Sequence, residues 1–284
     1  MSWTEHPVFV PAGDERLCGV VCAPDGELQD LAVVLLTGGN YTRSHRNRMW
    51  VRAARELADR GLASIRVDYH GIGDSTGHVV IALEHPVDDD VMAAADLLRQ
   101  ATGVGRIAFV ATCFGGRSAM AAAARRDDVA SVTTFPLPIM EPADEPTKAP
   151  LRRRIRRRLK RSAFGSALLR NPTVKQARTK IADARPDQAM IVSPRFRRDT
   201  ALVAKHAPVR LVFGEHTKEL PEARLLIGEL GHDLNPTELA RIELTVIPGT
   251  DIHRFQTFAE QDLVVSIAVD AAMRALGRDP ERAS

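Results

Sequence analysis

Short runs of consecutive apolar residues alternate along the chain with longer segments in which apolar residues recur every three or four positions. The runs have the length of strands buried on both faces, and the spaced segments have the period of amphipathic helices. We predict strands at 31–36, 62–69, 107–111, 130–135, 209–213 and 242–247, and helices at 46–60, 88–102, 194–204 and 260–276. This alternation predicts an α/β domain whose mostly parallel central sheet carries helices on both faces.

The chain opens with a different pattern. Residues 8–23 form two alternating apolar runs around Gly13-Asp14-Glu15, and Pro24-Asp25-Gly26 follows them. Alternation on both sides of a short polar turn is typical of an antiparallel hairpin. We therefore expect a hairpin ahead of the parallel strands.

One turn combines the features that present a nucleophile. The run 107–111 stops at Thr112-Cys113-Phe114-Gly115-Gly116, and an alanine-rich helix follows. Small residues two positions on either side of Cys113 let strand and helix approach closely while the turn residue takes strained backbone angles. A helix N-terminus favours a thiolate, so we predict Cys113 as a partly ionised nucleophile and the backbone N–H of Phe114 as an oxyanion donor. The alternative is an ordinary buried thiol.

A second oxyanion donor is expected where the first parallel strand ends. The run 31–36 continues into Thr37-Gly38-Gly39-Asn40. Glycines there allow a backbone N–H to face a ligand closely, so we predict Gly39 or Asn40 as the second donor. A simple strand-to-helix loop is the alternative.

Charge is unevenly distributed although the net charge is only +3. Residues 141–205 hold 18 Lys/Arg against 6 Asp/Glu, a charge of +12, and the remainder holds 21 against 30, a charge of −9. We predict a core of 1–140 with 206–284 and a basic helical cap inserted at 141–205. Asymmetry of this kind concerns association with partners more than fold. The partner-binding candidates are arginines of one basic helix: Arg152, Arg153, Arg156 and Arg157.

Composition narrows the class of protein further. No long uncharged apolar run suggests a membrane span, and the first residues do not read as a signal peptide. Three widely spaced cysteines do not suggest a disulfide framework, and Cys18 and Cys22 lack a histidine at metal-site spacing. We expect a cytoplasmic protein with no metal or cofactor and no nucleic-acid partner; the sequence leaves its oligomeric state open.

The order of these motifs resembles the α/β-hydrolase superfamily, in which nucleophile, acid and histidine each follow a strand. The run from Ser44-His45-Arg46 to Asp74-Ser75 also resembles the serine-aminopeptidase-like and exosortase-associated branch. The residues that carry the family resemblance are Thr37-Gly38-Gly39, the loop 68–77, Ala111-Thr-Cys-Phe-Gly115 and Pro248-Gly249-Thr-Asp-Ile-His253. The resemblance implies an eight-stranded core, a triad of Cys113, His253 and an acid, and acyl chemistry on esters, thioesters or amides.

The sequence departs from the family pattern in two ways. The nucleophile is cysteine, as in dienelactone hydrolases and some thioesterases. The position where the family usually has its acid is Thr217, so Glu215 or Glu219 must serve, or the acid is missing. His70 and Asp74 resemble a catalytic pair, but we expect them to shape their glycine-rich loop.

The cysteine favours a thioester substrate, because an acyl-enzyme on Cys113 is itself a thioester and its formation is nearly thermoneutral. Acyl carrier proteins are acidic and coenzyme A carries phosphates, and arginine clusters suit both. We expect an acyl-thioester hydrolase or acyltransferase acting on carrier- or CoA-bound acyl groups in secondary metabolism. The alternatives are a small-ester or lactone hydrolase, and a non-catalytic binding protein that keeps the fold and a basic cap.

Overall fold

The structure is a computed structural model that describes residues 2–39, 41–79, 81–143, 190–252 and 255–277. It divides into two compact units, Met1–Ile139 with Val192–Ser284, and Met140–Ile191. In the smaller unit most residues lie outside the described ranges. The predicted basic cap helix, with Arg152, Arg153, Arg156 and Arg157, is among them.

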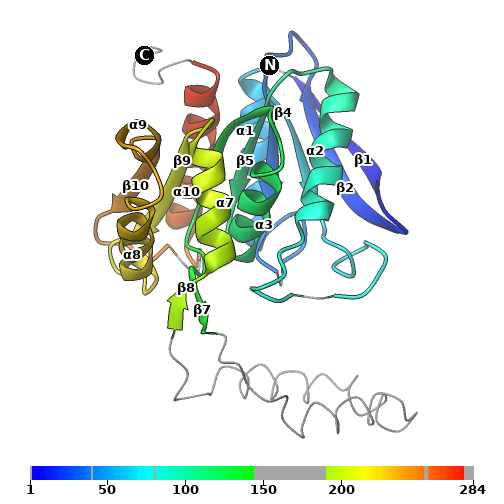
Figure 1. Ribbon diagram of the computed structural model, residues 1–284. Coiled ribbons are helices and arrows are strands. Elements are labelled where there is room, and N and C mark those ends of the chain that lie inside the picture. The colour runs from blue at the N-terminus through cyan, green and yellow to red at the C-terminus, as the bar shows by residue number, and fades with distance from the viewer. Residues whose placement is uncertain (1, 40, 80, 144–189, 253–254, 278–284) are drawn as a thin grey trace, which may run out of the picture. The chain divides into compact units, whose positions relative to one another are not determined.

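An eight-stranded sheet organises the larger unit (Figure 1). Its order is β1-β2-β4-β3-β5-β6-β9-β10, in which β1 and β2 form an antiparallel hairpin, β2 runs antiparallel to β4, and all later neighbours are parallel. The strands are β1 Trp3–Ala12, β2 Glu15–Pro24, β3 Ala32–Leu36, β4 Ala63–Val67, β5 Ile107–Ala111, β6 Val129–Thr134, β9 Val209–Gly214 and β10 Ile242–Ile247. The predicted hairpin and the mostly parallel sheet are confirmed.

Helices cover both faces of this sheet (Figure 1). One face carries α1, Met49–Asp59, and α10, Phe258–Ala275, which pack against each other. The other face carries α2 Asp88–Thr102, α3 Phe114–Ala123, α7 Pro194–Ala204 and α8 Leu220–Leu230. Two short helices, η1 Arg46–Arg48 and α9 Pro236–Leu239, lie in loops, and β7 Met140–Pro142 pairs with β8 Met190–Val192.

The helix predicted to begin at residue 46 begins at Met49. Asn47 and Arg48 have φ of 48° and 58°, which is left-handed backbone, so the α-helix cannot extend through them. The three residues before Met49 form a 3-10 turn instead.

The helix α7 belongs to the larger unit, although the sequence placed it in the inserted segment. It packs on α3, and the Arg117 guanidinium lies 5.8 Å from the ring centroid of Phe196. The Ser193 hydroxyl caps α7 by accepting from the Phe196 N–H. The inserted unit therefore ends near residue 191, not 205.

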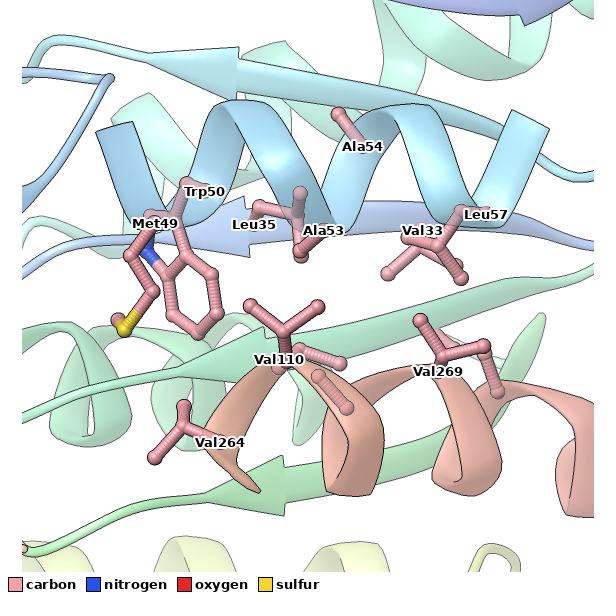
Figure 2. Close-up of a cluster of buried hydrophobic side chains, with 14 of the residues drawn as sticks. Val33, Leu35, Met49, Trp50, Ala53, Ala54, Leu57, Val110, Val264 and Val269 are labelled. Atoms are coloured by element: carbon pink, nitrogen blue, oxygen red, sulfur yellow. The ribbon is translucent and has the colours of Figure 1, made fainter. Parts of the chain in front are cut away.

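The core between α1, α10 and the sheet is continuous and apolar (Figure 2). Trp50 from α1 projects toward Val110 of β5 and Val264 of α10, and its indole Nε1 donates to the Leu36 carbonyl over 3.1 Å. This contact ties the start of α1 to the end of β3, just before the glycine-rich turn. In the described ranges no helix combines the length and apolar character required to cross a membrane.

Candidate active site

Cys113 occupies a strained turn between β5 and α3. Its backbone angles are φ 51° and ψ −127°, a left-handed φ that non-glycine residues rarely adopt. Backbone hydrogen bonds hold the turn, among them Thr112 N–H to Leu36 O at 3.1 Å, Cys113 N–H to Pro136 O at 3.0 Å, and Gly115 N–H to Thr112 O at 3.0 Å. Strain that survives in a turn fixed this firmly is typical of functional sites.

The glycines around Cys113 allow backbones to approach where a side chain would clash. A Cβ on Gly115 would lie 2.4 Å from the Thr37 carbonyl oxygen and 2.8 Å from the Tyr69 hydroxyl. A Cβ on Gly38 would lie 3.1 Å from the Cβ of Cys113. The end of β3 therefore packs directly on the turn, as the small residues in the sequence predicted.

The sulfur of Cys113 is less acidic than the sequence suggested. Burial raises the pKa of the half-buried thiol, and the nearby Glu219 carboxylate raises it further. The backbone N–H of Phe114 donates toward the sulfur, and Lys218 is positive; both lower the pKa without reversing its direction. This direction is opposite to the one expected of a partly ionised thiolate, because desolvation outweighs the Phe114 N–H and Lys218.

Of the predicted oxyanion donors, Phe114 and Gly39 are described and Asn40 is not. Phe114 is the first residue of α3, so its N–H has no partner within the helix. Gly39 follows Gly38, and a Cβ on Gly39 would lie 2.6 Å from Cδ1 of Ile81. The half-exposed Ile81 side chain thus lies over this turn and adds an apolar surface beside the site.

The two candidate acids lie in different environments. Glu215 is exposed, and its Oε2 accepts a 2.9 Å hydrogen bond from the backbone N–H of Gly249, which joins the loops after β9 and β10. Glu219 is 5% exposed and close enough to Cys113 to affect the pKa of its thiol. Thr217 is buried, and its hydroxyl accepts from the Gly214 N–H. Glu219 is therefore the candidate acid that lies near the sulfur, and the identity of the acid stays a prediction.

His253 lies outside the described residues, but the residues that flank its loop are described. Ile252 is fully buried in the apolar core, and Phe255 is 3% exposed. The Phe255 carbonyl accepts a 2.9 Å hydrogen bond from the side chain of Gln261 in α10. The role of His253 as base stays a prediction.

The glycine-rich loop 68–77 is held together by its charged residues, as expected. His70 Nδ1 lies 2.9 Å from Asp90 Oδ2, and Asp74 pairs with Arg43 at 3.0 Å. The buried Asp68 also pairs with Arg43. His70 and Asp74, which resembled a catalytic pair in the sequence, are therefore each paired with another residue and not with one another. Over the described parts of the chain, no group of three His, Cys, Asp or Glu residues could hold a metal ion.

A histidine that the sequence analysis did not single out lies next to the nucleophile turn. His45 is 7% exposed, and its Nε2 is 3.3 Å from the Thr112 hydroxyl. Its ring stacks on Tyr41 with centroids 4.6 Å apart and meets the edges of Trp50 and Phe255. The only sequence signal was the Ser44-His45-Arg46 run, which indicates no partner by itself.

We expect His45 to make folding sensitive to mild acid. Burial, with the positive Arg46 as a smaller cause, lowers the pKa of His45 from 6.5 to about 4. In the unfolded chain His45 is protonated as the pH falls through about 6.5, whereas in the folded chain it is protonated only near pH 4. The stabilising contribution is complete above pH 6.5 and is lost as the pH falls, by about 3 kcal/mol in all. The free energy of unfolding in urea, measured for wild type and His45→Gln between pH 7 and pH 4, tests this expectation. The same pH dependence in both proteins would contradict it.

The chain matches a family of known proteins. A family model described as "Alpha/beta hydrolase family" matches residues 33–267. Among curated protein sequences no match was found. The finer branch suggested by the Ser44-His45-Arg46 run stays a prediction.

Solved structures share the fold at low sequence identity. An esterase of Pyrococcus furiosus is 15% identical with a TM-score of 0.63, over 96% of this chain and 91% of that one. A dienelactone hydrolase of Anabaena variabilis is 17% identical with a TM-score of 0.60, over 96% and 98%. An alpha-beta serine hydrolase homologue of Coxiella burnetii is 13% identical with a TM-score of 0.60, over 93% and 95%.

Proposed function

Because the chain belongs to the α/β-hydrolase family, we propose that it is an acyl-thioester hydrolase or acyltransferase that works through a covalent acyl-Cys113 intermediate. The observation that carries the proposal is the strained backbone of Cys113 at the N-terminus of α3, with the Phe114 N–H donating toward its sulfur. A buried structural thiol needs neither feature. Both are what an attacking sulfur and a forming oxyanion require.

The raised pKa of Cys113 determines the order of events. The thiol is protonated at rest, so a base must take its proton as the sulfur attacks the acyl carbon. We assign that role to His253, which then returns the proton to the leaving thiol. The oxyanion accepts one hydrogen bond from the backbone N–H of Phe114 and a second from the backbone N–H of Gly39 or Asn40. Water, an amine or an alcohol then takes the acyl group from sulfur.

Cysteine suits a thioester substrate in particular. Transfer of an acyl group from a carrier thiol to Cys113 exchanges one thioester for another, so little free energy is lost at the first step. The half-exposed Ile81 offers an apolar contact for the acyl group beside Gly39. The cysteine favours thioesters over amides, because cleavage of an amide requires protonation of a poor leaving group whereas a thiolate leaves readily.

Detection of the intermediate tests the function. We expect the purified protein, mixed with a panel of acetyl to decanoyl CoA and N-acetylcysteamine thioesters, to gain the mass of one acyl group. Peptide mapping should place that group on Cys113, and Cys113→Ala should gain none. Absence of an adduct combined with turnover of p-nitrophenyl esters or lactones would favour the small-ester hydrolase. Absence of both would favour the binding protein.

The choice of acid gives a matched pair of variants. Glu219→Gln is expected to lower kcat by about 10²-fold, because a buried carboxylate that orients a catalytic imidazole loses its charge. Glu215→Gln should change kcat by less than about threefold, because the Glu215 carboxylate only accepts a hydrogen bond that joins two exposed loops. Steady-state kinetics on one thioester measures both. The reverse ranking would assign the acid to Glu215.

Docking of an acidic carrier is proposed for the basic segment. Replacing Arg152, Arg153, Arg156 and Arg157 together with Glu should raise KM for a carrier-bound acyl group by about 10²-fold or more. The KM for the same acyl group on N-acetylcysteamine, which carries no charge, should stay within about twofold. The ratio of the two kcat/KM values is the measurement. Equal losses on both substrates would reject the docking role.

A further inference from the structure

His45 lies between β3 and η1 in a backbone conformation that is almost confined to glycine. Its φ is 57° and its ψ is −177°. A side chain at such angles costs energy that a glycine would not, and the conformation persists only where the surroundings impose it. The sequence nevertheless has a histidine there, so its side chain must supply something that glycine cannot.

Both ring nitrogens of His45 have defined partners. Nδ1 accepts a 2.8 Å hydrogen bond from the backbone N–H of Arg46, which fixes the neutral tautomer with its proton on Nε2. That Nε2–H points to the hydroxyl of Thr112 at 3.3 Å. The imidazole therefore acts as a fixed donor to the residue that directly precedes Cys113.

The ring of His45 also contacts the loop after β10. Its centroid lies 5.3 Å from that of Phe255 in an edge-on arrangement, and Phe255 itself has a left-handed φ of 46°. Two further rings, Tyr41 and Trp50, close the remaining sides. His45 thus joins three separate loops, and two of them contain a strained residue of their own, Cys113 and Phe255.

We propose that His45 is a positioning residue, which holds the Cys113 turn through Thr112 and braces it against Phe255, so that the sulfur stays aligned for attack. The proposal rests on the proposed role of Cys113 as nucleophile. His45 moves no proton in the reaction, because both of its nitrogens are engaged in fixed hydrogen bonds. The role is distinct from packing, since a ring of the same size without nitrogens could fill the same aromatic niche.

Two variants separate positioning from packing. His45→Phe keeps a buried ring and loses both hydrogen bonds, and Thr112→Val keeps the shape of Thr112 and loses the acceptor. We expect each to lower kcat on an N-acetylcysteamine thioester by about tenfold with KM within about twofold, because each loses one hydrogen bond that aligns the nucleophile. The double variant should fall no further than either single variant. His45→Gln, which retains an N–H donor, should recover part of the loss.

Alkylation of Cys113 by iodoacetamide gives a second readout that needs no substrate. Its rate should fall about tenfold in His45→Phe and in Thr112→Val. The rate at Cys18, measured by peptide mass in the same sample, should not change, whereas a loosened fold would raise it. If His45→Phe fails to fold, Thr112→Val decides alone.

The outcomes distinguish this inference from the proposed function. Unchanged kcat and unchanged Cys113 alkylation in Thr112→Val, or losses that multiply in the double variant, would overturn the positioning role. If Cys113→Ala retains full turnover, the proposed function fails instead. If Cys113→Ala loses turnover while His45→Phe and Thr112→Val keep wild-type kcat, the proposed function stands and only the role of His45 is rejected.

Discussion

Replacement of Cys113 by alanine is expected to lower kcat on a thioester substrate by about 10⁴-fold or more, with the fold intact. No covalent intermediate can form without the sulfur, and the oxyanion donors alone provide only the residual rate. The side chain contributes little to packing, because Cys113 is half-buried and the turn is held by backbone hydrogen bonds. Circular dichroism and thermal unfolding should therefore match wild type while steady-state turnover disappears.

Serine at the same position provides a sharper comparison. Cys113→Ser keeps size and geometry, but the hydroxyl is a far weaker acid than the thiol, and this site already disfavours the anion of the sulfur. We expect kcat about 10²-fold or more below wild type. Cys18→Ala, a change in β2, serves as control and should leave kcat unaltered. Near-wild-type turnover in Cys113→Ala would contradict the nucleophile assignment.

Gly115→Ala is expected to destabilise the fold by about 3 kcal/mol and to abolish turnover. The new Cβ would lie 2.4 Å from the Thr37 carbonyl oxygen, which belongs to a backbone that cannot move without disturbing β3. It would also press on the buried Tyr69 hydroxyl, which donates to that same carbonyl at 2.9 Å. Both contacts act on the turn that carries Cys113, so stability and activity should fall together.

The neighbouring glycine is a matched control in the same helix. A Cβ on Gly116 would lie 3.1 Å from Cδ1 of Leu137, at the end of a side chain that can move. Alanine gains about 1 kcal/mol over glycine in a helix interior, so Gly116→Ala should be close to neutral. Urea unfolding and kcat of the two variants test the comparison. Equal stability in both would show that the turn tolerates a side chain at 115.

Several elements of this fold are encoded by residues that are close together in the sequence. The strands at 107–111 and 242–247 and the helices at 88–102 and 194–204 were predicted with the bounds that the structure has. The turn at Cys113 was predicted because the small residues that it needs are its neighbours in sequence. Each of these features depends on residues a few positions apart.

Other parts of the site depend on contacts between distant segments. Nothing local distinguishes Glu219 from Glu215; their burial and partners do. His45 and Thr112 are 67 positions apart in the sequence. A contact between such distant residues leaves no periodic pattern of apolar positions from which it could be predicted. The membership of α7 in the larger unit was missed for the same reason, because its packing on α3 is a long-range contact.

The α/β alternation, the hairpin, the parallel core and the position of the cysteine turn can all be predicted from the order of residues along the chain. These follow from the period of apolar residues and from where glycine lets two backbones meet. Long-range packing sets the burial that raises the pKa of the Cys113 thiol, the acid that lies near the sulfur, and the contacts by which His45 joins three loops. A pKa and a hydrogen bond depend on what surrounds a group in space, and folding brings those surroundings from remote parts of the chain.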